Sequence, residues 1–425
     1  MKDFFRLNQH ETTLKQEVGA GLTGFFTIVY IIVVNSLILS EAGMPLEGAV
    51  LATILTSFVG CLFMGLWGNA PILIVPGMGI NAMFTYTLVG SLGLTWQEAL
   101  GVVVVSGVIL TVISFSALTE SISESIPRTL KEAISVGIGM FLILLGLDSG
   151  DVIGTGKSSI LALGQFRDPS VQATILTFFI ALVLHIKNVK GNFLWTILAG
   201  IGVAYVFGVL PSGSGGSFSL QSYGDVWSAF TLESWLKLPF IASVFSITMV
   251  VLFENISLVT THTSFAGDPS KFKKAFQASS FSVLLSGVLG SSPTVATAES
   301  TAAIAAGGRT GLTSVTTGLL FVGTIFFIPY IHIIPSNAIA PILMIIGGLM
   351  VKNITNLQFK DNIEAIAAIF TIVLIPFTFS IADGIAIGFI LYAGLKLVSG
   401  KAKDVSITLF SIAGLFLLYF ILPYV

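Results

Sequence analysis

The sequence has few charged residues and a single cysteine. Only 9% of its 425 residues are charged and 54% are hydrophobic, whereas soluble domains carry about 25% charged residues. A soluble fold of this length would need far more polar surface. The lone cysteine, Cys61, excludes a disulfide framework and any cysteine-based zinc or iron–sulfur site. The composition therefore predicts an integral membrane protein.

Other absences exclude further classes of protein. The formal net charge of −2 gives no basic surface for nucleic acid, so no nucleic-acid partner is predicted. The polar start of the chain lacks the apolar core and cleavage site of a secretory signal. We find no metal-ligand cluster, nucleophile–base pair or phosphate loop in the sequence. We therefore predict a protein that is not an enzyme and that has no catalytic residues, cofactor or metal.

Long apolar runs dominate the chain instead. A membrane-spanning helix needs roughly 20 apolar residues. Two of the runs are too short to cross alone, and each follows a stretch rich in Gly and Pro or in Ser and Thr. The predicted membrane elements are 18–40, 46–68, 78–90, 97–118, 127–147, 170–187, 193–210, 238–262, 275–290, 297–306, 313–332, 336–351, 361–380 and 383–397, and a further apolar run covers 405–422.

The two halves of the chain resemble each other. Residues 125–147 resemble 334–351, and Gly-Asn-Ala-Pro at 68–71 corresponds to Gly-Ser-Ser-Pro at 290–293. Because each half has an odd number of spans, successive repeats must have opposite membrane orientations. Short elements interrupted by Gly and Pro at corresponding positions indicate the binding site of a transporter.

The distribution of Lys and Arg predicts the orientation. If the N-terminus is cytoplasmic, sixteen of the 19 Lys and Arg residues lie on the cytoplasmic side of the membrane, as the positive-inside rule requires. Residues 396–403 are then cytoplasmic, and 405–422 either crosses the membrane or lies along it. Residues 211–237 are rich in Gly and Ser and then amphipathic, which predicts an extracytoplasmic interfacial linker. We therefore predict a multi-pass protein of the cell membrane.

Two carboxylates lie deep in the predicted spans. Glu254 and Glu299 each have at least eight residues without Lys, Arg, Asp or Glu on either side. Ionisable residues inside a membrane are costly and usually functional. For each, the alternative is a structural role, hydrogen-bonded to a neighbouring helix or to backbone freed by a break. Their corresponding positions, one on a long span and one beside a break, favour a shared cavity.

A heterocyclic base suits such a cavity. A carboxylate accepts two in-plane N–H bonds, and backbone N–H groups at a broken helix bind ring acceptors. Desolvation disfavours the charged form of a buried carboxyl, which can then exchange a proton near neutral pH. We assign the coupling proton and part of the substrate contact to Glu254, because Ser and Thr hydroxyls surround Glu299. The alternatives are that Glu254 only binds the base, with coupling elsewhere, or that transport is uncoupled.

The first break contains Pro76, Gly77 and Gly79 ahead of a helix. Glycine lets backbone approach a ligand closely, and a helix N-terminus presents unpaired N–H groups. A packing kink is the alternative, since Gly and Pro are common in membrane helices. Asn81 either binds substrate or satisfies the broken backbone. Asn35 either faces the same cavity or links neighbouring helices.

Four other polar residues are weaker candidates. His185 and His332 fall near span ends, which indicates interfacial positions. Asp383 lies between two spans and is typical of a turn or helix cap. Arg309 is either a charge of an inside loop or half of a gating ion pair.

Three segments resemble the AzgA-type purine permeases of the nucleobase–ascorbate transporter superfamily. They cover residues 76–89, 290–315 and 377–392, and the likeness extends from about residue 5 to 422 with the spans in the same order. The most specific stretch runs from Glu299 to the sequence GGRTGLT, which ends at Thr313.

The resemblance implies an all-α polytopic membrane protein with two inverted seven-span repeats. Short antiparallel strands in broken elements 3 and 10 would meet beside the substrate, between a core domain and a gate domain. The implied division is 1–17 cytoplasmic N-terminus, 18–118 core domain first half, 119–210 gate domain first half, 211–237 linker, 238–332 core domain second half, 333–397 gate domain second half and 398–425 C-terminal apolar helix.

The resemblance also implies import of adenine, guanine or hypoxanthine, generally with protons, by elevator- or rocking-type alternating access. The family usually has an aspartate where Glu254 stands, and often an aromatic residue and an isoleucine where Thr297 and Ala298 stand. These departures leave the preferred purine open. The complete set of predicted substrate-binding residues is Glu254, Glu299, Asn81, Gly77, Gly79, Thr297, Ala298 and Asn35.

The predicted partners are a purine base, a proton and the lipid bilayer, with a homodimer left open. The principal alternative is an anion transporter or channel of the same inverted-repeat fold. Broken-helix N-termini favour anions, but two buried carboxylates oppose them and the deep spans hold no Arg or Lys. A membrane enzyme or receptor is the third class, and long soluble loops are absent.

Overall fold

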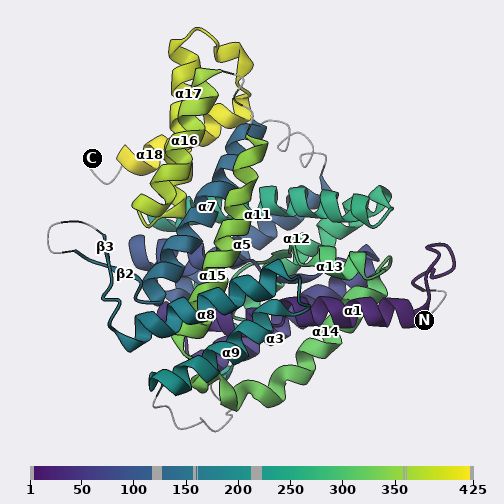
Figure 1. Cartoon of the computed structure of the whole chain (residues 1–425). Coiled ribbons are helices and arrows are strands. Elements are labelled where there is room, and N and C mark those ends of the chain that lie inside the picture. The colour runs from purple at the N-terminus through teal and green to yellow at the C-terminus, as the bar shows by residue number, and fades with distance from the viewer. Residues whose placement is uncertain are drawn as a thin grey trace.

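The computed structural model describes residues 4–116, 127–156, 159, 161–211, 223–357, 359 and 361–421. Helices dominate these residues and form one bundle (Figure 1). The first half contains α1 (Leu14–Ile28), α2 (Ile31–Glu41), α3 (Leu46–Phe63), η1 (Met64–Gly68), β1 (Ile74–Pro76), α4 (Met78–Ala82), η2 (Met83–Ser91), α5 (Trp96–Phe115), α7 (Arg128–Ser149), β2 (Ile153–Gly154), β3 (Ala162–Leu163), α8 (Pro169–Ile186) and α9 (Asn192–Phe207).

The second half follows the same plan. It contains α11 (Leu238–Phe265), η3 (Pro269–Lys271), α12 (Phe272–Val288), β4 (Thr294–Ala296), α13 (Ser300–Ala305), α14 (Gly311–Gly323), η4 (Thr324–Ile333), α15 (Ser336–Val351), η5 (Lys352–Asn356), α16 (Asn362–Phe377), α17 (Ile381–Val398), η6 (Ala402–Asp404) and α18 (Ile407–Ile421). Both broken elements consist of a strand followed by a short helix. The Gly/Pro and Ser/Thr stretches predicted the breaks, and the family resemblance implied the strands.

The helices are long and apolar enough to form a membrane domain. In the described part of the chain, 9 helical segments qualify as candidate spans by length and hydropathy, and three more apolar helices are shorter. The helix bounds follow the predicted spans closely. The apolar run 405–422 forms α18, which packs against α17 and α11. The protein is therefore a multi-pass membrane protein.

The helices pack in two groups. In one group, α1 runs along α14 and α13, α3 contacts α2 and α14, and α5 contacts α11 and α12 (Figure 1). In the other, α7 contacts α15 and α16, α8 contacts α9 and α15, and α16 contacts α17. Contacts between the groups include α4 with α7 and α1 with α9.

The linker is described from residue 223 onward and packs across helix ends. The Ser228 N–H donates to the Val288 carbonyl at 2.9 Å, and the Thr231 N–H donates to the Gln97 carbonyl at 3.1 Å. Trp227 and Trp235 are exposed, as expected of an interfacial segment. The Gly/Ser-rich part of the predicted linker, 212–222, lies outside the described residues. So do three of the lysines counted for the orientation: Lys2, Lys157 and Lys360.

Helix α1 begins at Leu14, before the predicted span start at residue 18. Glu17, the last residue of the predicted N-terminal segment 1–17, is fully buried. Its carboxylate accepts bonds from the Arg309 N–H at 2.9 Å, the Thr310 N–H at 3.2 Å and the Thr313 hydroxyl at 2.6 Å. Glu17 thus caps the N-terminus of α14, where backbone N–H groups lack helical partners and the dipole favours negative charge.

Replacing Glu17 with Ala is expected to destabilise the protein strongly. The change leaves two backbone N–H groups without their charged acceptor, which costs about 3 kcal/mol. Thermal unfolding of the purified protein in detergent should occur at a clearly lower temperature than in wild type. The exposed Glu233, replaced with Ala, is the control and should leave the transition unchanged. Equal transitions for both variants would contradict a capping role for Glu17.

Candidate functional site

The two broken elements meet through their strands. β1 and β4 pair antiparallel, with Ile74 opposite Ala296, Val75 opposite Val295 and Pro76 opposite Thr294. The pairing extends past both ends of the strands. The Gly77 N–H donates to the Pro293 carbonyl at 3.2 Å, and the Thr297 N–H donates to the Leu73 carbonyl at 3.3 Å. The resemblance predicted this pair of strands, and the prediction is confirmed.

The glycines of the first break permit close packing. A Cβ atom on Gly77 would lie 2.7 Å from the Val295 Cγ2 of the facing strand, and one on Gly79 would lie 2.6 Å from the Ile138 Cγ2 of α7. Real Cβ atoms do not approach other atoms so closely. Gly77 therefore lets the strands pair, and Gly79 lets α4 lie against α7.

Asn35 joins α2 to both broken elements. Its side-chain oxygen accepts bonds from Asn81 Nδ2 at 3.1 Å and from the Ser292 hydroxyl at 3.0 Å. Its nitrogen donates to the Thr53 hydroxyl at 2.8 Å. This side chain links helices, which is one of its two predicted roles. Asn81 is also fully buried, and its Oδ1 has no hydrogen-bond partner within the described part of the chain.

Glu299 lies between β4 and α13 and is the N-cap residue of α13. Its Oε1 accepts a 2.6 Å hydrogen bond from the hydroxyl of Tyr30, which lies between α1 and α2. The buried Tyr30 ring meets Phe193 of α9 edge to face, with ring centroids 4.8 Å apart. A chain of direct contacts therefore runs from Glu299 to α9. Sequence reasoning missed Tyr30.

Glu254 lies on α11 beside Glu299. The two carboxylates are close enough for their charges to interact, so the structure brings the two predicted groups together. The Glu254 side chain is partly buried, and within the described residues its carboxylate has no hydrogen-bond partner. Both carboxylate oxygens are thus available to a ligand.

The residues before Glu299 contribute polar and open positions. The Thr297 hydroxyl is buried and has no partner among the residues that the structure describes. Ala298 is exposed. Next along the chain, the Thr301 hydroxyl lies 3.3 Å from Nε2 of His262, a buried residue of α11. The start of α13 therefore carries a carboxylate, a hydroxyl without a partner among the described residues, and an exposed alanine.

Asn255 is a second residue that sequence reasoning missed. Its Oδ1 accepts the backbone N–H of Ala296 at 3.0 Å and the Ser279 hydroxyl at 2.7 Å. It thereby ties β4 to α11 and α12 and sets the distance between Glu254 and the broken element. Its position directly after Glu254 on a deep span was the available signal.

Replacing Asn255 with Ala should loosen the site. The Ala296 N–H would lose its side-chain acceptor in a buried place, which costs about 1–3 kcal/mol. We expect lower thermal stability together with weaker ligand binding. Ser257, exposed on the same helix, provides the matched control when replaced with Ala. If the Asn255 variant equals the Ser257 variant in both measurements, Asn255 does not position the strand.

The weaker candidates lie outside α11 and α13. His185 bonds Asn192 at 2.9 Å and stacks on Phe193, and His332 lies 3.5 Å from a Glu47 oxygen. Asp383 lies in the first turn of α17. Arg309 donates to the carbonyls of Ile304 and Gly308. Within the described residues, no group of three or more His, Cys, Asp or Glu side chains could hold a metal ion.

Known proteins resemble this chain in sequence. The family described as the Permease family matches residues 15–387. The chain is 48% identical to the nucleobase transporter PlAzg2 of Paenibacillus larvae over 89% of this chain and 77% of that protein. It is 35% identical to the guanine/hypoxanthine permease PbuO of Bacillus subtilis over 94% of this chain and 96% of that one.

A solved structure shares the fold. The transmembrane domain of the cyanobacterial bicarbonate transporter BicA superposes with a TM-score of 0.66 at 16% identity, over 87% of this chain and 97% of that one. At this identity the likeness concerns the fold alone. With the family match and the two relatives, it confirms the resemblance and the fold class. The chain belongs to the Permease family, as its likeness to the AzgA-type purine permeases predicted.

Proposed function

We propose that this protein is a secondary active transporter that imports purine nucleobases by proton symport. The observation that carries the proposal is the pair of neighbouring carboxylates, Glu254 and Glu299, beside the paired strands β1 and β4. The printed names of the two relatives, a nucleobase transporter and a guanine/hypoxanthine permease, support the substrate class.

In this proposal Glu299 accepts N–H bonds from the base. The Tyr30 hydroxyl holds one carboxylate oxygen in place, and the other oxygen is available to accept an N–H of the ligand. Charge-assisted hydrogen bonds of this kind are strong and directional. The unpaired Thr297 hydroxyl and Asn81 Oδ1 offer further bonds to ring nitrogens, carbonyls or amino groups. A site with several such groups rejects analogues that leave them unpaired.

Glu254 is proposed to carry the coupling proton. The turn before it, Val250–Phe253, is apolar, and α11 contains no Lys or Arg. The charge on Glu299 opposes a second negative charge nearby. Both conditions favour a carboxyl that takes up a proton. A ring nitrogen or carbonyl of the base that accepts the O–H of the protonated carboxyl would then bind better when Glu254 is protonated, which links protonation to occupancy. A proton taken up outside and released inside then accompanies each base.

Alternating access is proposed to move the core domain, 18–118 and 238–332, against the gate domain, 119–210 and 333–397. The packing of α1–α5 with α11–α14 and of α7–α9 with α15–α17 supports this division. The ring contact between Tyr30 and Phe193 lies between the groups, so a movement of the core would carry Glu299 away from α9. We place the N-terminus in the cytoplasm, following the distribution of Lys and Arg.

An anion transporter of this fold is the competing proposal. The likeness to BicA concerns the fold only and does not favour an anion for this chain. Anion sites use cationic side chains and helix N-termini. Here α4, α11 and α13 contain no Lys or Arg, and the N-cap position of α13 is a carboxylate. The local charge therefore favours a neutral ligand with N–H donors.

Growth and uptake in bacterial cells that lack their own purine permeases test the proposal. Cells expressing the wild-type chain should take up radiolabelled guanine, hypoxanthine or adenine well above cells carrying the empty vector. An excess of unlabelled purine should compete, whereas an excess of bicarbonate should not. Uptake equal to the vector control for all three bases would refute the proposed function.

A further inference from the structure

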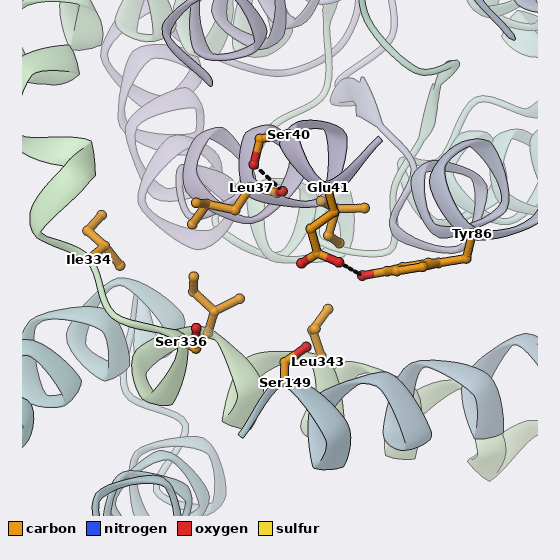
Figure 2. Close-up of a pocket in the computed structure, with 10 residues that line it drawn as sticks. Leu37, Ser40, Glu41, Tyr86, Ser149, Ile334, Ser336 and Leu343 are labelled. Atoms are coloured by element: carbon orange, nitrogen blue, oxygen red, sulfur yellow. Dashed lines mark hydrogen bonds between the residues drawn. The ribbon is translucent and has the colours of Figure 1, made fainter. Parts of the chain in front are cut away.

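A second cavity lies away from the paired strands. It has a volume of about 180 Å³ and lies between α2 and η2 on one side and α7 and α15 on the other. Figure 2 shows Glu41 and Tyr86 on one side of it and Ser149, Ser336 and Leu343 on the other. Pockets for drug-sized ligands measure roughly 300–1,000 Å³, so this one suits a single small molecule.

The cavity is lined by one carboxylate, a few hydroxyls and several aliphatic side chains. Glu41 Oε2 accepts a 2.7 Å hydrogen bond from the Tyr86 hydroxyl, which leaves Oε1 for a ligand. Figure 2 shows the Glu41 carboxylate extending from α2 toward α7 and α15. The hydroxyls of Ser149 and Ser336 also line the cavity, and the remaining lining is largely aliphatic: Leu37, Ile38, Ile334, Ile339 and Leu343.

The position of the cavity relates it to the central site. Glu41 and Asn35 both lie on α2, six residues apart, which corresponds to about 9 Å along a helix. Asn35 bonds Asn81, and Tyr86 follows Asn81 on the same broken element. The lining residues lie at the end of α7 opposite Arg128 and at the end of α15 opposite Lys352. Basic helix ends face the cytoplasm, so the cavity lies toward the extracytoplasmic side.

We propose that this cavity is a second, weaker binding site for the transported base on its way from outside to the paired strands. The inference rests on the proposed function and extends it. Glu41 Oε1 would accept a ring N–H or an exocyclic amine, and the serine hydroxyls would bond ring nitrogens or carbonyls. The aliphatic side chains would cover the faces of the flat ring. Because Glu41 and Ser336 are exposed, the site binds less tightly than one with two partly buried carboxylates.

The test is equilibrium binding of radiolabelled hypoxanthine, guanine and adenine to the purified full-length protein. Wild type should bind up to two molecules of the transported base per chain, one tightly and one weakly. Glu41→Gln replaces one carboxylate oxygen with an NH₂ group and should lower the affinity of the weak site about tenfold or more. The tight site should keep its affinity, and the KM for uptake should rise.

Three further variants separate the two sites. Ser336→Trp fills the cavity from α15 and should remove the weak site without changing the carboxylate. Glu299→Gln should weaken the tight site and leave the weak one. Glu233→Gln, an exposed carboxylate of the linker, should bind as wild type.

The outcomes distinguish this inference from the proposed function. A single class of sites in wild type, with affinity and KM unchanged in both Glu41→Gln and Ser336→Trp, overturns the second site and leaves the proposed function standing. Loss of the tight site in those two variants also overturns it, because the cavity would then belong to the central site. No binding of any base to wild type overturns both.

Discussion

Glu254→Gln is expected to abolish accumulation of purine against a concentration gradient. An inward proton gradient of one pH unit corresponds to about 1.4 kcal/mol, enough for about tenfold accumulation at one proton per base. Glutamine keeps the shape of the side chain but cannot take up and release a proton. Proteoliposomes with the variant should therefore equilibrate the base without concentrating it, whereas wild type should concentrate it severalfold.

Exchange of base for base provides the internal control for this variant. It requires binding and movement of the protein but no net proton transfer, so it should survive in Glu254→Gln at a reduced rate. Glu364, a buried carboxylate on α16 that accepts the Thr129 hydroxyl at 3.0 Å, is the matched control residue. Glu364→Gln should still accumulate the base. If Glu254→Gln also concentrates base in response to the gradient, the coupling proton is carried elsewhere or transport is uncoupled.

Glu299→Gln is expected to weaken binding of the base about ten- to a hundred-fold. The change replaces one acceptor oxygen with an NH₂ group and removes the charge, and a hydrogen bond to a charged group contributes about 1.5–3 kcal/mol. The Tyr30 hydroxyl can still donate to the remaining amide oxygen, so the local fold should persist. Equilibrium binding of radiolabelled base to the purified variant measures the loss directly.

Two further variants decide how Glu299 acts. Tyr30→Phe removes the 2.6 Å hydrogen bond to Glu299 but leaves the carboxylate, so binding should weaken less than in Glu299→Gln. Glu364→Gln again serves as the control for loss of a buried carboxylate and should bind normally. Unchanged affinity in a correctly folded Glu299→Gln protein would show that this side chain does not bind the base.

The broken elements were predictable because their cause is local. Pro76 and Gly77 interrupt one apolar run and the Ser/Thr-rich stretch after Pro293 interrupts the other, so each run is too short to span a membrane. The helix bounds could also be predicted, because each span is an apolar run of sufficient length that ends at polar residues or at Gly and Pro. The isolation of Glu254 and Glu299 among apolar residues identified them as candidates without any structure.

The contacts that complete the site were not predictable in this way. Tyr30 and Glu299 are 269 positions apart, and no periodicity in the sequence relates an aromatic residue near the end of one helix to a carboxylate in the other half. Asn255 is one of several amides in apolar runs, and only the pairing of β4 shows what it bonds. Glu17 fell at the end of the predicted N-terminal segment 1–17, while its hydrogen-bond partners lie at the start of α14, 292 to 296 positions along the chain.

Uptake by liposomes that contain only this protein tests the central claim most directly. An inward proton gradient would be imposed, and radiolabelled hypoxanthine, guanine, adenine and bicarbonate would be supplied separately. The account predicts that at least one purine accumulates above its outside concentration, that accumulation disappears when the proton gradient is collapsed, and that bicarbonate does not enter. Entry of bicarbonate without uptake of any purine would contradict it.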